Sequence, residues 1–251
     1  MRTLSLVLLC ALLARGAAAQ PPRVHGTRDK LQLDGRLNES AWQRADSVDD
    51  FRQSEPREGD AATERTVVRF VAAPDGLWVG IHAYDREPSR ILRAQLRRDT
   101  ELDSDDAVQV MLSPLQDKRT AFLFAVNPNG AQQDAEVVSF ESENLDWDGV
   151  WDARTQIDAD GWMAEIFIPW QTLRYRAENP AWDVNVRRVI RRKNEDVLWK
   201  AWRRTEGIKF LERAGVVEGF TDLPPRATAE LRPYLAATGS GMSRDYGTTD
   251  G

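Results

Sequence analysis

The sequence has little of several residue types that common site chemistries require. It contains one cysteine, Cys10, and two histidines, His25 and His82, among 251 residues. Cys10 lies inside an N-terminal apolar run, so the rest of the chain offers no thiol nucleophile, disulfide or zinc-finger ligand set. Two isolated histidines exclude any scheme that needs several imidazoles as bases or metal ligands.

Signatures of well-known enzyme classes are also missing. The sequence contains no G-x-S-x-G, H-E-x-x-H, Walker-type phosphate loop or dinucleotide-binding fingerprint. Its formal net charge is −6, and an acidic chain is a poor partner for nucleic acid. These absences favour a binding protein over those enzyme classes and over a nucleic-acid-binding protein.

The N-terminus has the three parts of a secretory signal peptide. Arg2 is followed by an apolar run over 4–13 and by the small residues Ala17 and Ala19. The run is too short to span a bilayer. We therefore expect 1–19 to be a signal peptide cleaved before Gln20, and the protein to be exported.

Alternation of apolar and polar residues, the period of a half-buried strand, recurs along the chain. It predicts short strands at 65–72, 77–84, 107–112, 121–126, 150–157, 162–168, 182–190, 197–202 and 215–220. Turn residues occur at 74–76, 127–130 and 158–161, while helical signals are limited to 38–44 and 170–175. The sequence therefore predicts an all-β fold, an antiparallel β-sandwich over 24–222.

The composition changes after Pro224 and Pro225. A further strand-like segment at 229–237 precedes a tail at 239–251 that is rich in Gly, Ser, Thr and Asp. We interpret 227–251 as the start of a second, truncated C-terminal region.

The motifs resemble, in their order, those of carbohydrate-binding module family 9. They read LDGRLNESAW, ERTVVRF, LWVGIHAYD, SDDAVQVML, TAFLFAVNPNG, DWDGVWDA, DGWMAEIFIPW and WDVNVRRVIRR. The chain resembles in particular the variant at the N-terminus of bacterial outer-membrane proteins whose remainder is a β-barrel. The resemblance covers about 24–220.

The resemblance implies a jelly-roll-like sandwich that holds a sugar end between aromatic rings, structural calcium, and a barrel beginning near Ala227. It also implies an oligo- or polysaccharide partner, a link to polysaccharide breakdown or uptake, and a location in the periplasm or outer membrane of a Gram-negative-type bacterium.

Trp147 and Trp151 are the first candidates for sugar binding. A sugar pairs its apolar C–H face with an aromatic ring and its hydroxyls with polar groups, and both tryptophans lie among acids and Asn144. A turn at Asp148-Gly149 would lift Trp147 off the sheet. The alternative is that both rings cover the edge of the sandwich.

Trp199 and Trp202 form a second candidate group. Lys200, Arg203 and Arg204 lie between and after them, which predicts either a mixed aromatic and cationic binding edge or an ordinary surface contact. Four other tryptophans are predicted to be core residues, because three lie in alternating segments and one in a helical segment: Trp78, Trp162, Trp182 and Trp42.

Calcium prefers six to eight oxygen ligands, which acidic loops supply. The segment 99–106 offers Asp103, Asp105 and Asp106, with Asp146 or Asp148 as further ligands across space. The spacing is not that of an EF-hand. The alternative is a solvated acidic loop that protects an edge strand.

No catalytic residues are assigned. Glu165, on the face of the strand at 162–168 opposite Ile166, is the most notable carboxylate, and pairing with Arg187 or Arg188 is its simpler interpretation. Two alternatives to a sugar-binding module remain open: an interaction or plug domain of an outer-membrane barrel that binds no sugar, and a glycoside hydrolase.

Overall fold

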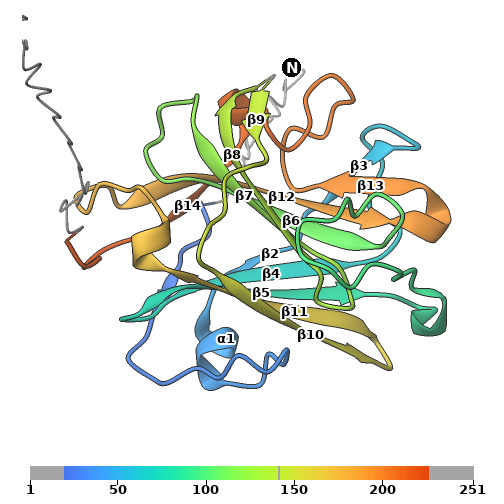
Figure 1. The fold of residues 1–251 in the computed structure, drawn as a ribbon, viewed down its shortest axis with the longest axis horizontal. Helices are drawn as coiled ribbons and strands as arrows, with labels where there is room; N and C mark the ends of the chain where they lie inside the picture. The colour runs from blue at the N-terminus through green and yellow to red at the C-terminus, as the bar shows by residue number, and fades with distance from the viewer. Residues whose placement is uncertain (1–19, 141, 226–251) are drawn as a thin grey trace, which may run out of the picture.

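The computed structural model describes residues 20–140 and 142–225, which form two stacked β-sheets (Figure 1). The six-stranded sheet has the order β1-β4-β5-β11-β10, with β2 beside β4. Its strands are β1 (His25–Gly26), β2 (Ser47–Val48), β4 (Thr66–Ala72), β5 (Gly76–Tyr84), β10 (Asp152–Asp158) and β11 (Gly161–Pro169). The predicted all-β sandwich is confirmed.

The eight-stranded sheet forms the second layer, in the order β3-β13-β12-β6-β7-β8-β9, with β14 beside β12. Its strands are β3 (Arg52–Glu55), β6 (Ala107–Ser113), β7 (Ala121–Val126), β8 (Gln132–Ser139), β9 (Ser142–Asn144), β12 (Ala181–Ile190), β13 (Glu195–Leu198) and β14 (Gly215–Glu218). The named strand pairs are antiparallel except β1–β4, which is parallel.

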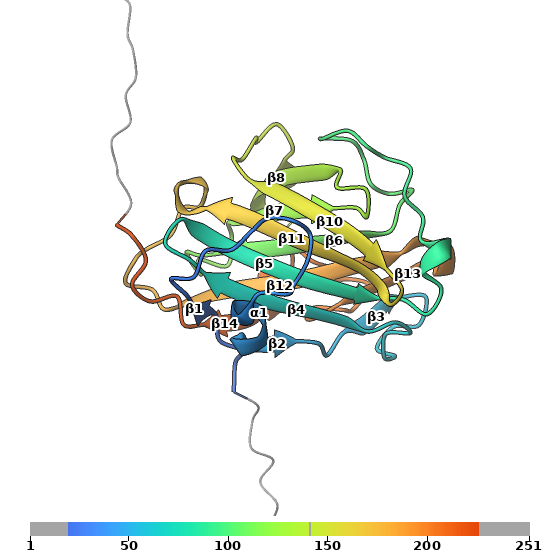
Figure 2. The same ribbon diagram turned by 90° about the horizontal axis from the view of Figure 1, so that it is seen from below.

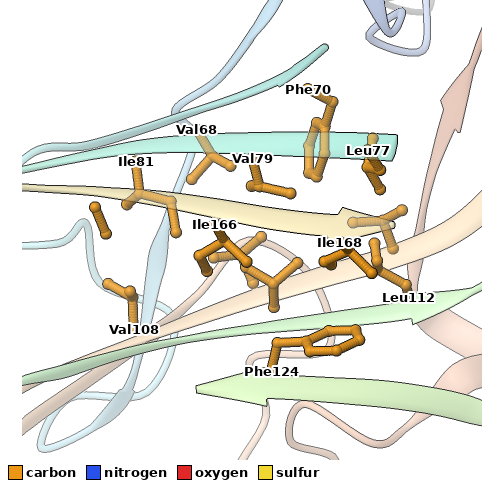
Figure 3. Packing of buried hydrophobic residues seen from close by; sticks show 14 of the residues in the cluster. Val68, Phe70, Leu77, Val79, Ile81, Val108, Leu112, Phe124, Ile166 and Ile168 are labelled. Carbon is orange, nitrogen blue, oxygen red and sulfur yellow. The ribbon is translucent and has the colours of Figure 1, made fainter. Parts of the chain in front are cut away.

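The core lies between the two sheets, where the inward residues of each strand meet. Figure 3 shows Val79 and Ile81 of β5 and Ile166 of β11 facing Val108 of β6 and Phe124 of β7. Each of these side chains is 0% exposed, as the alternation in the sequence requires. The four tryptophans predicted to be core residues are 0 to 5% exposed, which confirms that prediction.

Each sheet also carries a covering segment on its outer face. Helix α1 (Ser40–Arg44) and the chain before it lie on the six-stranded sheet, on the side away from the core (Figure 1). The connection from β13 to β14 lies on the outer face of the eight-stranded sheet, where Ile208 and Leu211 pack on Met111 and Leu123.

The strands predicted from alternation match the structure to within two residues at most of their ends. In the eight-stranded sheet, β13 ends at Leu198, so 199–202 is not a strand, and β3, β8 and β9 were missed. In the six-stranded sheet the two-residue strands β1 and β2 were missed. The helical turn predicted at 170–175 is a 3-10 turn at Trp170–Thr172. The predicted strand at 229–237 lies outside the described residues. Within 20–140 and 142–225, no helix is long and apolar enough to cross a membrane.

Candidate functional site

A row of polar side chains crosses the open part of the outer face of the eight-stranded sheet. Arg187 of β12 is paired with Gln109 of β6, which is paired with Ala125 of β7, and Ala125 is paired with Gln133 of β8. Directly paired residues point to the same side of a sheet. Arg187, Gln109 and Gln133 are half-buried, and we call them the polar row.

Arg187 is fixed by its neighbours. Its Nε lies 2.8 and 2.7 Å from the two carboxylate oxygens of Asp196 on β13, and its Nη1 donates to Oε1 of Gln109 at 3.1 Å. The side chains of Arg187 and Asp196 are 29% and 23% exposed, so the pair is accessible at one edge. A planar guanidinium held in this way presents its remaining donors in a fixed direction.

A hollow of about 350 Å³ lies beside the polar row, which is within the usual size of ligand sites. Three cations and three carboxylates line it with a small apolar part: Ser54, Glu55, Arg187, Asp196, Leu198, Arg204, Glu206, Gly207, Ile208 and Lys209. Trp202 packs against the cluster that contains Leu198 and Ile208. Balanced charge and mixed polarity suit a neutral, polyhydroxylated ligand.

Two segments border this face, the β13–β14 connection and the β8–β9 hairpin, and two contacts join them. Lys209 and Glu143 form an ion pair at 3.3 Å, and the rings of Phe140 and Phe210 meet edge to face at 5.1 Å. Figure 1 shows the two segments rising side by side on the far side of the sheet from the core. The wall of the face is thus built from segments about 70 residues apart.

Trp147, the first predicted sugar platform, packs on the core instead of standing clear of the sheet. It is half-buried, its ring lies 5.0 Å from that of Phe122, and it packs against the main core cluster. The neighbouring Asn144 is exposed on the edge strand β9. The structure therefore separates Trp147 from the polar row, which is on the opposite face of the same sheet.

Trp151 and Trp199 are core residues, each 6% exposed. The guanidinium of Arg98 lies over the Trp151 ring at 5.5 Å, and a Cβ added at Gly215 would come within 2.3 Å of the Trp199 ring. Neither ring has a free face of the size that sugar stacking requires. Of the four predicted tryptophans, Trp202 is the one beside the hollow.

The five aspartates predicted to bind calcium are a poor fit for one shared ion. Both carboxylate oxygens of Asp105 accept hydrogen bonds, from the backbone N–H groups of Ala94 and Gln95 at 2.8 Å. Asp148, 81% exposed, pairs with Arg98, and Asp103 and Asp146 are exposed. Asp106 accepts from a backbone N–H and lies near buried arginines. No group of three or more metal-ligating side chains occurs within 20–140 and 142–225.

Glu165 is fully buried, and its predicted pairing with Arg187 or Arg188 is wrong. Oε2 of Glu165 accepts the backbone N–H groups of Gly35 and Asp34 at 2.8 and 2.9 Å. Both arginines belong to the other sheet: Arg188 is 0% exposed and donates to backbone carbonyls of β5 and its neighbour. The chain before α1 covers Glu165, so the carboxyl is closed to any substrate.

The comparisons with known proteins find likeness in structure. No protein-family model matches the chain, and no curated protein matches it significantly in sequence. A proposed carbohydrate-binding protein from Bacteroides uniformis ATCC 8492 has a TM-score of 0.60 at 10% identity, over 78% of this chain and 97% of that one. A family 9 carbohydrate-binding module from Caldicellulosiruptor kristjanssonii, in complex with cellotriose, has a TM-score of 0.52 at 13% identity, over 85% of this chain and 100% of the module. Its complex with glucose gives the same TM-score and identity over 84% and 100%. At these identities the likeness shows the fold, which is that of carbohydrate-binding modules of the β-sandwich type.

The residues of the polar row were not among the sequence-predicted candidates. The sequence predicted Arg187 as a possible partner of Glu165 and predicted no role for Gln109 or Gln133. A signal for Arg187 and Gln109 was present, since both occupy outward positions of strands whose alternation was recognised. Gln133 belongs to β8, which was not recognised as a strand.

Proposed function

We propose that this protein is a carbohydrate-binding module that takes an oligo- or polysaccharide on the outer face of its eight-stranded sheet. The observation that carries the proposal is the polar row, in which Asp196 fixes Arg187, beside a hollow of about 350 Å³. Sugar hydroxyls require convergent donors and acceptors, and the row supplies a guanidinium and two amides. The fold neighbours that hold cellotriose and glucose support this class of ligand and make those sugars the first to test.

The experiment is calorimetric titration with cellotriose and glucose, followed by a glycan array that includes uronate-containing chains. Gln109→Ala removes one amide from the row, and we expect it to weaken binding about 5-fold, the worth of one hydrogen bond of about 1 kcal/mol. Arg187→Ala removes a charged donor and is expected to cost more. The matched control is Arg154→Ala, because Arg154 is exposed on the other sheet.

Equal losses in the control and the two row variants would place the sugar elsewhere. Flat titrations across the whole array would support the alternative of an interaction or plug domain that binds no sugar. A glycoside hydrolase is not favoured, because the buried Glu165 has no access to a bound chain.

The proposals of export, of a role in polysaccharide breakdown or uptake, and of continuity with a membrane barrel rest on the sequence. The segments 1–19 and 227–251 that motivate them lie outside the described residues. N-terminal sequencing of the protein recovered from the periplasmic and outer-membrane fractions should give Gln20 as the first residue. Recovery in the cytoplasm with Met1 retained would contradict export.

A further inference from the structure

The segment 27–45, which we call the strap, lies across the outer face of the six-stranded sheet and ends in α1 (Figure 2). Trp42 of α1 and Leu37 rest on β5 at Gly80. A Cβ added there would lie 2.7 Å from Cδ2 of Leu37 and 2.9 Å from Cε3 of Trp42. The strap covers an apolar cluster that includes Trp78 and Phe167 on the outer face.

One carboxyl group holds the centre of the strap to the sheet. Glu165 of β11 is paired with Gly80 and is 0% exposed. Its Oε2 accepts hydrogen bonds from two backbone N–H groups of the strap, those of Asp34 and Gly35. Gly35 has φ +83°, and a Cβ there would lie 2.8 Å from the backbone of Thr155 on β10, so the strap backbone lies directly against the sheet at this turn.

The second oxygen of the carboxyl, Oε1, is buried without a hydrogen-bond partner among the described residues, and so is Oε2 of Glu39. The strap presents two acids to the group, Asp34 and Glu39, and their charges oppose ionisation of its carboxyl. Arg154 lies opposite on β10, but its guanidinium is bound within its own strand. On β5 the titratable residues of this face are His82 and Tyr84. On β4, Arg69 is paired with the same Gly80 as Glu165, and the Leu37 and Trp42 side chains rest on that glycine between the two strands.

We propose that Glu165 is a pH-sensitive latch that holds the strap on the six-stranded sheet when its carboxyl is neutral and loosens it when the carboxyl is ionised. When the carboxyl of Glu165 is neutral, Oε1 can stay buried at little cost, or it can carry the proton and donate a hydrogen bond. A buried carboxylate with one unpaired oxygen and two acidic neighbours is destabilised, and opening of the strap hydrates it. Opening uncovers the apolar outer face of this sheet and leaves the polar row of the other sheet in place.

The direction and size of the effect follow from proton linkage. Burial raises the pKa of Glu165 from 4.5 to about 7 in the closed state, despite the opposing effect of the two backbone N–H groups. An acid with a raised pKa favours the closed state below its ordinary value and loses that stabilisation as the pH rises through 4.5 to 7. If the open state has the ordinary pKa, the opening constant increases about 30-fold between pH 5.5 and 8.

Hydrogen exchange of the Asp34 and Gly35 amides tests the latch. Their protection factors, corrected for the intrinsic pH dependence of exchange, should fall about 30-fold between pH 5.5 and 8 in the full chain. They should not change in Glu165→Gln, which keeps an oxygen for the two amides and cannot ionise. Glu212→Gln, at an exposed acid, is the matched control and should behave as the unsubstituted protein. The amide of Val110 in the other sheet serves as an internal reference.

The proposal would be overturned if the protection factors of the Asp34 and Gly35 amides did not change with pH, or if they fell equally in Glu165→Gln. If Glu165→Gln does not fold, the carboxyl ¹³C shift of Glu165 in the unsubstituted protein decides. A midpoint near 7, shared by the amide shifts of the strap, supports the latch. A midpoint below 5, or strap amides that titrate with a different midpoint, contradicts it.

Discussion

Replacing Trp147 by alanine separates a structural role of this ring from a ligand-binding role. The ring packs against Phe122 and Phe124, with centroid separations of 5.0 and 6.0 Å, at the side of the eight-stranded sheet that faces the core. The polar row is on the other side of that sheet. We therefore expect Trp147→Ala to destabilise the fold and to leave sugar binding unchanged.

The magnitude follows from burial. Removing a fully buried tryptophan costs about 3 to 5 kcal/mol, and Trp147 is half-buried. We therefore expect a loss of about 2 kcal/mol. In a domain of about 200 residues, each kcal/mol lowers Tm by about 2 to 4 °C, so Tm should fall by about 4 to 8 °C.

The assay combines urea unfolding with titration of cellotriose at a temperature where the variant is folded. Trp147→Phe is the matched control, because a phenyl ring retains much of the contact with Phe122 and should recover part of the lost stability. An unchanged Tm together with lost binding in Trp147→Ala would refute the reasoning and restore Trp147 as the sugar platform.

Three further predictions test the buried contacts that hold the two sheets in place. Arg188→Ala removes a fully buried guanidinium from among acidic groups, and we expect a loss of about 3 to 5 kcal/mol in urea unfolding; a loss below 1 kcal/mol would contradict a structural charge network. Gly215→Ala forces a Cβ to within 2.3 Å of the rigid Trp199 ring and should cost about 1 to 3 kcal/mol, whereas Gly26→Ala, with nothing within 4 Å, should be near neutral. For Asp105, burial pushes the pKa up but backbone N–H donors outweigh it, so the pKa lies below 3.8. Its stabilisation should therefore be present at neutral pH and lost in acid, and Asp105→Asn should flatten that part of the acid unfolding curve.

The two sheets could be predicted where inward positions are uniformly apolar. In β6, the alternation of Val108, Val110 and Leu112 with polar residues gave the correct strand. β8 was missed because Asp134 occupies one of its inward positions. Asp134 is 2% exposed and accepts from Arg98 at 2.7 Å and from the backbone N–H of Gly149 at 2.6 Å. A buried acid with partners from two distant loops breaks the pattern that marks a strand.

The positions of single aromatic and acidic side chains could not be predicted, since distant parts of the chain decide them. The acids and Asn144 near Trp151 suggested a binding role, but the guanidinium of Arg98, 53 residues earlier, lies over its ring. The charge of Glu165 suggested an arginine partner, yet its partners are backbone amides about 130 residues earlier. Local sequence contains the strand pattern and does not contain these contacts.

The polar row depends on strand register in the same way as the core does. Arg187, Gln109 and Gln133 come from three strands and lie in one row because β12, β6, β7 and β8 are paired in one register. A slip of one residue would turn each of these side chains into the core and turn Val186 and Val110 outward, at a large cost in buried apolar area. The apolar half of the alternation therefore fixes the geometry of the polar half.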